Sequence, residues 1–114
     1  MMGRVEAAEA VSDRTGAVVL LKGADTVVTS GSGSTYINTT GNPGMATGGS
    51  GDVLTGVITA FAASGTAPLD AARAGAFVHG MAGDLAAGIM GQWGMTATDI
   101  RDQLPATLRG IVGK

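Results

Sequence analysis

From Val5 to Thr15, apolar residues recur every three positions between charged and polar ones. This spacing predicts a surface helix, and Gly16 can end that helix in the left-handed conformation. The next residues, Ala17–Leu21, form a continuous apolar run rich in branched side chains. Such a run is typical of a buried strand in a parallel sheet. A helix followed by a buried strand is half of an α/β repeat.

Two short strand patterns follow, at Thr26–Thr29 and Ser34–Asn38. They are separated by Ser30–Gly33, whose glycines tolerate the positive φ angles that tight turns require. This arrangement predicts a β-hairpin.

Beyond the hairpin the chain becomes rich in glycine. The segment Thr40–Gly51 contains five glycines, one proline and no large side chain except Met45. An apolar stripe with helical spacing follows it, made up of Val53, Leu54, Val57, Ile58, Phe61 and Ala62. We therefore expect a glycine-rich loop that leads into a buried helix.

The C-terminal part of the chain predicts further helices. Pro68 and Asp70 suit a first helical turn, and the helix continues through apolar side chains spaced four apart, namely Phe77, Met81, Leu85 and Ile89. Alanines and glycines crowd its other faces, so neighbouring backbones can approach closely. After a glycine-rich break, we expect Thr98 to cap a last helix from Asp99, with Pro105 kinking that helix or starting a new one.

The composition indicates an unusually apolar surface. Hydrophobic residues make up 45% of the 114 residues and charged residues 14%, against about 25% charged residues in an average domain. A chain of this length forms a single domain. We therefore expect it to pack against copies of itself, or to be part of a larger fold that covers its apolar faces.

Charge, cysteine content and hydropathy disfavour several classes of protein. A net charge of −2 provides no basic surface for sequence-independent nucleic-acid binding. The lack of cysteine removes disulfides, thiolate nucleophiles and cysteine zinc sites. No apolar run reaches the ~18 residues of a membrane span, and the first nine residues lack the apolar core of a signal peptide. We expect a soluble cytoplasmic protein that binds neither nucleic acid nor membrane.

The glycine-rich loop offers a site for an anion. The backbone N–H groups of Gly48 to Asp52 would lie at the N-terminus of the predicted helix, where they lack acceptors and the helix dipole favours negative charge. Glycine lets a phosphate sit directly on the backbone. The loop is not a Walker loop, because it contains no lysine. Positive charge for a phosphate must therefore come from the backbone, a metal ion or another segment.

Asp52 follows this loop in the first turn of the predicted helix. The helix dipole stabilises its ionised carboxylate, which is placed to accept a proton from a hydroxyl that attacks a bound phosphate. Phosphoryl transfer needs little beyond positioning, charge stabilisation and such a base. The alternative is that Asp52 only caps a helix after a flexible loop.

The segment Thr40–Leu54 has the sequence T-G-N-P-G-M-A-T-G-G-S-G-D-V-L. It closely resembles the signature of the ADP-dependent NAD(P)H-hydrate dehydratases, a branch of the ribokinase-like superfamily. Sugar and vitamin kinases of that superfamily share only the short G-[AS]-G-D core. The segment Lys22–Thr26 is similar to the family's K-G-A-x-T strand end, and the last helices match as well. The resemblance covers residues 1–114 as the C-terminal portion of the family's domain.

This resemblance implies a ribokinase-like α/β fold, here the C-terminal segment of a parallel-sheet domain with an anion-binding loop leading into a buried helix. It implies that a group of residues contacts the nucleotide: Lys22, Gly23, Ala24, Asp25, Thr26, Gly48, Gly49, Ser50 and Gly51. Asn42 and Asp52 would contact the substrate, and Asp52 would be the catalytic base. The implied cofactors are ADP or ATP and Mg²⁺, with a homo-oligomer, a tetramer, as the assembly.

The activity that the resemblance implies is repair of hydrated NADH or NADPH. The ring hydroxyl would be phosphorylated at the expense of ADP, and loss of phosphate would restore the reduced dinucleotide. Two alternatives stay open. The first is a small-molecule kinase acting on a sugar or vitamin precursor, and the second is an inactive nucleotide-binding or oligomerising fragment.

Other polar residues give weaker signals. Lys22 ends a strand, where it either contacts the nucleotide or extends to solvent. His79 is a lone histidine in a helix rich in alanine and glycine, which is more typical of a core or interface position than of a catalyst. Asp84 lies five residues from His79, so the two do not share a helix face. The sequence predicts no metal ligands.

Overall fold

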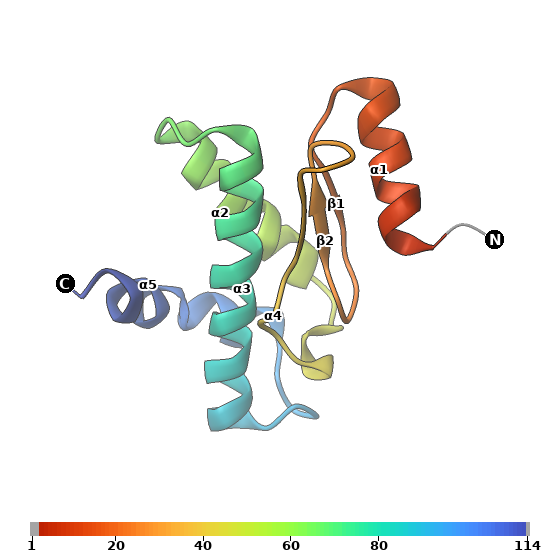
Figure 1. Ribbon diagram of the computed structural model, residues 1–114. Helices are drawn as coiled ribbons and strands as arrows, with labels where there is room; N and C mark the ends of the chain where they lie inside the picture. Colours follow the sequence, from red (N-terminus) through yellow and green to blue (C-terminus); the bar gives the residue numbers. More distant parts are fainter. Residues whose placement is uncertain (1–2, 114) are drawn as a thin grey trace.

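A small sheet separates helix α1 from the remaining helices (Figure 1). The computed structural model describes residues 3–113. Its elements, in chain order, are α1 (Arg4–Thr15), β1 (Val19–Leu21), β2 (Val27–Thr29), β3 (Thr35–Ile37), the 3-10 helix η1 (Pro43–Met45), α2 (Ser50–Ala63), α3 (Pro68–Met90), α4 (Ala97–Asp102) and α5 (Leu104–Val112). None of the helices in these residues is long and apolar enough to cross a membrane.

Helix α1 forms where the apolar spacing predicts it. Gly16 follows its last residue with φ 72°, and the Gly16 N–H donates to the Ser12 carbonyl at 2.8 Å. Ala8 and Ser12 are buried against the sheet, while Glu6 and Arg14 are exposed. The glycine cap and the surface helix are therefore both confirmed.

The sheet has the order β1-β2-β3, and both pairs are antiparallel. For the residues that the structure describes, two expectations for Ala17–Leu21 are wrong. The strand pairs antiparallel and not parallel, and it is not completely buried. It covers only Val19–Leu21, which is partly exposed and pairs with β2 from Val19↔Thr29 onward. The physical reason is the short connection from β1 to β2, because a parallel crossover needs a dozen or more residues. The fully buried strand is β2.

The hairpin expected between Thr26 and Asn38 is confirmed. Strands β2 and β3 pair from Val27↔Ile37 to Thr29↔Thr35. The Ser30 N–H donates to the Ser34 carbonyl at 3.1 Å, and Gly31 and Gly33 adopt φ angles of 124° and 91°. These positive angles are the reason for glycine in this turn.

Helix α2 follows the glycine-rich loop as expected, but it is not a buried helix. Only Ser50 and Leu54 are buried, and the rest of its apolar stripe is partly or fully exposed. The helix packs through one narrow face against α3, where a Cβ on Gly75 would clash with Ile58. The other side of the stripe has no covering element among residues 3–113.

Helix α3 is buried through its small residues and not through its large ones. Its buried set is Ala71, Ala72, Gly75, Ala76, Val78, His79, Gly80, Ala82, Gly83 and Ala86. Three of the apolar side chains spaced four apart are well exposed: Phe77 at 41%, Leu85 at 43% and Ile89 at 67%. The spacing thus predicts the helix correctly but not its buried face, whereas the close approach expected from alanine and glycine is confirmed.

The apolar surface expected from composition is also present, since Trp93 is fully exposed.

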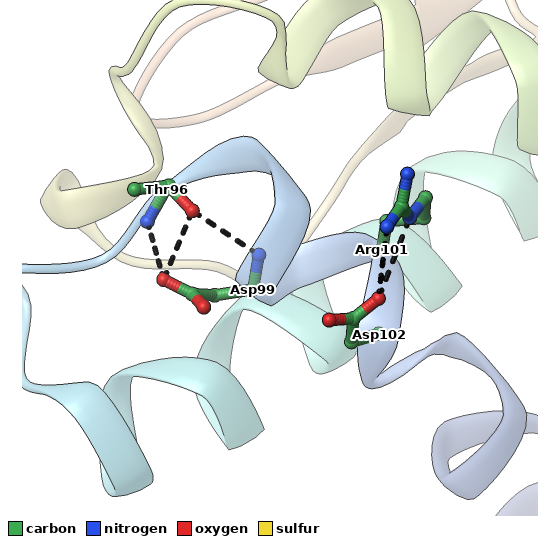
Figure 2. Close-up of polar contacts among 4 residues, drawn as sticks. All are labelled: Thr96, Asp99, Arg101 and Asp102. Carbon is green, nitrogen blue, oxygen red and sulfur yellow. Dashed lines mark hydrogen bonds and ion pairs between the residues drawn. The ribbon is translucent and has the colours of Figure 1, made fainter.

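Thr96, and not Thr98, caps α4 (Figure 2). The Asp99 N–H donates to Thr96 Oγ1 at 3.3 Å, and the Thr96 N–H donates to Asp99 Oδ2 at 2.8 Å. This reciprocal pair is a capping box, which needs an acid three residues after the cap, so it selects Thr96. Pro105 begins a new helix, α5, one of the two outcomes expected. Ile100 of α4 is fully buried against α3.

Candidate functional site

A cavity of about 690 Å³ lies where the end of β1, the loop before η1, the first turn of α2 and the middle of α3 meet. Seven of the residues predicted to bind ligand line it: Lys22, Gly23, Ala24, Thr26, Asn42, Ser50 and Gly51. Asp25, Gly48, Gly49 and Asp52 do not line it. The fold therefore brings the Lys22–Thr26 turn and the start of α2 to one cavity, although they are far apart in the sequence.

The N-terminus of α2 forms the anion-accepting part of this cavity. Gly49 precedes the helix with φ 88° and provides no side chain to cap it. The first helical bond from this end joins the Val53 N–H to the Gly49 carbonyl at 3.1 Å. Within residues 3–113, nothing accepts a hydrogen bond from the N–H groups of Gly51 and Asp52. Two free donors at the positive end of a helix dipole suit a phosphate.

Lys22 brings a positive charge to this helix end. A Cβ added to Gly51 would clash with Lys22 Nζ, so the ammonium lies directly against the glycine. The loop itself holds no lysine, and the sequence leaves the source of the positive charge open. In the structure, Lys22 reaches across from the end of β1 and places its ammonium at this helix end.

Asp52 lies in the first turn of α2, with an exposed side chain beside the cavity. No hydrogen bond joins its carboxylate to another residue of the described chain. The carboxylate is therefore accessible to a ligand that bridges the cavity and the open side of α2. Its catalytic role stays a prediction.

The loop before α2 is fastened by Asp84, a residue that sequence reasoning missed. The Gly41 N–H donates to Asp84 Oδ2 at 3.1 Å, and Asn42 Nδ2 donates to Asp84 Oδ1 at 2.9 Å. Asn42 Oδ1 in turn accepts from the Gly44 N–H at 3.1 Å and caps η1. Asn42, predicted to contact substrate, thus lines the cavity with an amide that already bonds within the protein.

Small residues on α3 let this loop lie close to the helix. A Cβ on Gly80 would clash with Thr40, and one on Gly83 would clash with Met45. Thr40 Oγ1 donates to the Phe77 carbonyl at 2.9 Å, beside the two glycines. In the sequence, Gly80, Gly83 and Asp84 lie along one side of a helix, but that spacing does not identify the loop residues that they contact.

We expect Asp84→Asn to loosen the loop. An amide in place of the carboxylate presents an NH₂ group to one of two donors, the Gly41 N–H or the Asn42 amide, so one contact is lost. Loss of a hydrogen bond to a charged acceptor on the surface should lower the free energy of unfolding by about 1 kcal/mol. Urea denaturation measures this. Asp102→Asn is the control, because Asp102 only pairs with exposed Arg101 and such pairs contribute little. Equal stability of Asp84→Asn and wild type would contradict the role of Asp84.

His79 is buried on α3 and faces the start of α2. Its Nε2 lies 3.3 Å from Ser50 Oγ, and the ring lines the cavity. Burial lowers the pKa of His79 below its usual 6.5, a hydrogen bond with the Ser50 backbone opposes this shift, and the charge of Lys22 adds to it. A neutral imidazole therefore holds Ser50 at the first position of α2. The burial agrees with the core position expected for a lone histidine.

The burial of His79, the chain's single histidine, should make stability depend on pH. The unfolded chain keeps the usual pKa of 6.5, whereas the folded pKa is lower. Below pH 6.5 the unfolded state binds a proton that the folded state does not, so the free energy of unfolding falls as pH drops. Urea denaturation at about pH 7.5 and about pH 5.5 should show a smaller loss for His79→Gln than for wild type. Equal losses in both proteins would count against this linkage.

Comparison with known proteins decides the family. Residues 2–106 match the family model Carb_kinase, which is described as NAD(P)H-hydrate dehydratase. The chain belongs to this family. The resemblance seen at Thr40–Leu54 is thereby confirmed.

Curated Carb_kinase relatives share up to about half of the matched residues. The chain is 53% identical over 108 residues to the bifunctional NAD(P)H-hydrate repair enzyme Nnr of Moorella thermoacetica, covering 95% of this chain and 20% of that protein. It is 43% identical over 91 residues to the ADP-dependent (S)-NAD(P)H-hydrate dehydratase of Xanthomonas campestris, covering 80% of this chain and 32% of that protein. The chain therefore spans between a fifth and a third of the length of these relatives.

A solved structure of the same family has the same fold. The ADP/ATP-dependent NAD(P)H-hydrate dehydratase of Bacillus subtilis, co-crystallised with ATP and Mg²⁺ and soaked with CoA, superimposes with a TM-score of 0.88 at 30% identity. The match covers 94% of this chain and 40% of that one. The chain thus has the fold of the corresponding part of a ribokinase-like dehydratase, as expected.

Proposed function

We propose that this chain provides the nucleotide-binding end of an ADP-dependent NAD(P)H-hydrate dehydratase. The observation that carries the proposal is the placement of Lys22 Nζ against Gly51, at a helix end where the N–H groups of Gly51 and Asp52 are free, beside a cavity of about 690 Å³. A single ammonium and two unpaired helix amides are donors suited to a phosphate. The names of the relatives support hydrated NADH or NADPH as the substrate. Residues 1–114 would then be the C-terminal portion of the dehydratase domain.

In this proposal, the terminal phosphate of ADP or ATP lies on the N–H groups at Gly51. Lys22 compensates its charge, and Gly23, Ala24 and Thr26 form the wall beside the nucleotide. Nucleotide binding also involves the turns that contain the other predicted residues, namely Asp25, Gly48, Gly49 and Ser50. Asn42, which also lines the cavity, would contact the substrate.

Mg²⁺ is proposed as the partner of the nucleotide. In nucleotide sites this ion is held mainly by phosphate oxygens and water, with one or two carboxylates. The donors that line this cavity, backbone N–H groups and an ammonium, suit the phosphates and not the ion itself. Bound Mg²⁺ would neutralise charge that develops on the transferred phosphoryl group.

The proposed reaction uses Asp52 as a base. Its carboxylate accepts the proton of the ring hydroxyl, and the hydroxyl oxygen bonds to the terminal phosphorus of ADP while the bond to the bridging oxygen breaks and AMP leaves. The new phosphate ester lies next to a ring nitrogen whose lone pair assists departure of phosphate. Loss of a ring proton then restores the reduced nicotinamide. Phosphoryl transfer alone therefore drives the dehydration.

The test is recovery of the dihydronicotinamide absorbance when the protein is given hydrated NADH, ADP and Mg²⁺. Recovery that needs ADP supports the proposal. If there is no recovery and a sugar or thiazole alcohol is phosphorylated with ATP, the protein is a kinase of the same superfamily. A protein that neither turns over nor binds ADP is the inactive fragment of the second alternative.

We also propose self-association of this chain, as a tetramer in the cytoplasm. The support is the exposed apolar surface of α3 and α5, which includes Ile89, Ile111 and Val112 at 67%, 48% and 63% exposure. Apolar surface of this extent commonly marks an interface. No role in nucleic-acid or membrane binding is proposed.

A further inference from the structure

Arg4 holds the turn that carries Lys22. Its Nη1 donates to the Asp25 carbonyl at 2.8 Å, and its Nη2 donates to the carbonyls of Leu21 and Lys22 at 3.2 and 2.8 Å. One guanidinium thus binds backbone oxygens from both ends of the turn. The fork of fixed N–H donors in arginine suits this arrangement, which a lysine ammonium does not reproduce.

The turn has few other bonds of its own. Within the turn itself, the Gly23 N–H donates to Thr26 Oγ1 at 3.4 Å and Thr26 Oγ1 donates to the Gly23 carbonyl at 3.2 Å, and at its end the Thr26 carbonyl accepts from the Asn38 N–H at 2.9 Å. Gly23 also makes room for the guanidinium, because a Cβ there would lie 2.5 Å from Arg4 Nη2. The geometry of the turn therefore depends on a side chain from α1.

The position of Arg4 is unfavourable for the helix that contains it. Arg4 is the first residue of α1, where the positive end of the helix dipole disfavours a cation. An acidic residue at this end would stabilise α1, so the benefit of Arg4 comes from outside its own helix. The three carbonyls of the turn are the contacts that explain it.

We propose that Arg4 is a positioning residue for nucleotide binding: it fixes the Lys22–Thr26 turn so that the Lys22 ammonium rests on Gly51 at the start of α2. This inference rests on the proposed function. Arg4 does not line the cavity, so it acts through Lys22 and the turn and not on the ligand. Helix α1 thereby contributes to the site from the far side of the sheet (Figure 1).

The first test measures ADP affinity by calorimetry. Arg4→Gln should weaken ADP binding about 10-fold, a change of about 1.4 kcal/mol. Arg4→Lys keeps the charge but loses the fork, so it should also weaken binding. Arg14→Gln is the matched control on the same helix, because Arg14 makes no hydrogen bond or ion pair within residues 3–113, and it should bind ADP as wild type does. Wild-type affinity in both Arg4 variants would overturn the proposal.

A double-mutant cycle separates positioning from a general effect on stability. If Arg4 acts through Lys22, Arg4→Gln should cost little further ADP affinity once Lys22→Met is present. A merely structural role predicts that the two losses add, and additive losses would overturn the proposal. Thermal unfolding of each variant confirms that folded proteins are compared.

A second readout needs no nucleotide. The sequence has two lysines, Lys22 and Lys114, so amine labelling followed by mass spectrometry reports Lys22 with Lys114 as the reference. Arg4→Gln should raise the labelling rate of Lys22 relative to Lys114, and Arg14→Gln should not. Unchanged Lys22 labelling overturns the positioning role even if ADP binds. If the wild-type protein does not bind ADP but Arg4→Gln still raises the labelling rate of Lys22, the proposed function is refuted. The positioning of Lys22 by Arg4 then stands.

Discussion

Asp52→Asn is expected to lower turnover of hydrated NADH by about 10²–10⁴-fold, the usual cost of removing a positioned base. ADP affinity should stay within a few-fold of wild type, because Asp52 does not line the cavity and the donors for the phosphate are backbone groups. Asparagine preserves the size of the side chain and its place in the first turn of α2. The change therefore removes proton acceptance and little else. Single-turnover absorbance recovery and ADP calorimetry give the two quantities.

Asp70→Asn is the matched control for this experiment. Asp70 is the third residue of α3, as Asp52 is the third residue of α2. Both carboxylates therefore have the same relation to a helix dipole, and both are exposed. Asp70 pairs only with Arg73 at 3.5 Å on the surface. Turnover close to wild type in Asp52→Asn would reduce Asp52 to a helix-terminal charge like Asp70.

Local elements of this fold follow from the sequence, because their determinants are near in the chain. The apolar spacing before Gly16 and the glycines at positions 31 and 33 each specify a structure that closes within a few residues. The anion-accepting end of α2 follows in the same way, since glycines before an apolar stripe leave helix N–H groups free. The Thr96 cap was missed because Thr98 also precedes an acid, and only the capping box distinguishes them.

Burial and long-range contacts do not follow from these local patterns. The four-apart series of α3 predicts an apolar face, yet that face is exposed, because close packing against α2 and the loop selects alanine and glycine instead. The strand Val19–Leu21 is apolar on both sides, but a short connection forces it into antiparallel pairing with β2. Lys22 reaches Gly51, and Asp84 reaches Gly41, only after the chain has folded. Sequence spacing carries no information about such pairs.

Gly51→Val is expected to weaken ADP binding by at least about 100-fold, or about 2.7 kcal/mol. The Cβ of the valine would clash with Lys22 Nζ. Since that ammonium is the end of a flexible side chain, the lysine moves away and the domain stays folded. The branched side chain then covers the free N–H groups of Gly51 and Asp52, so the phosphate loses both its charge partner and its backbone donors.

Gly56→Val controls for the general effect of replacing a glycine of α2 by valine. Gly56 lies in the same helix, is exposed, and has no atom within 4 Å of an added Cβ. Both substitutions replace a glycine of α2 by valine, which changes helix propensity by only a few tenths of a kcal/mol, but only Gly51→Val reaches Lys22. We expect Gly56→Val to bind ADP as wild type does and Gly51→Val to unfold at a similar temperature without binding. Because only the valine at position 51 lies at the proposed phosphate site, unchanged ADP affinity in a folded Gly51→Val protein would mean that the phosphate lies elsewhere.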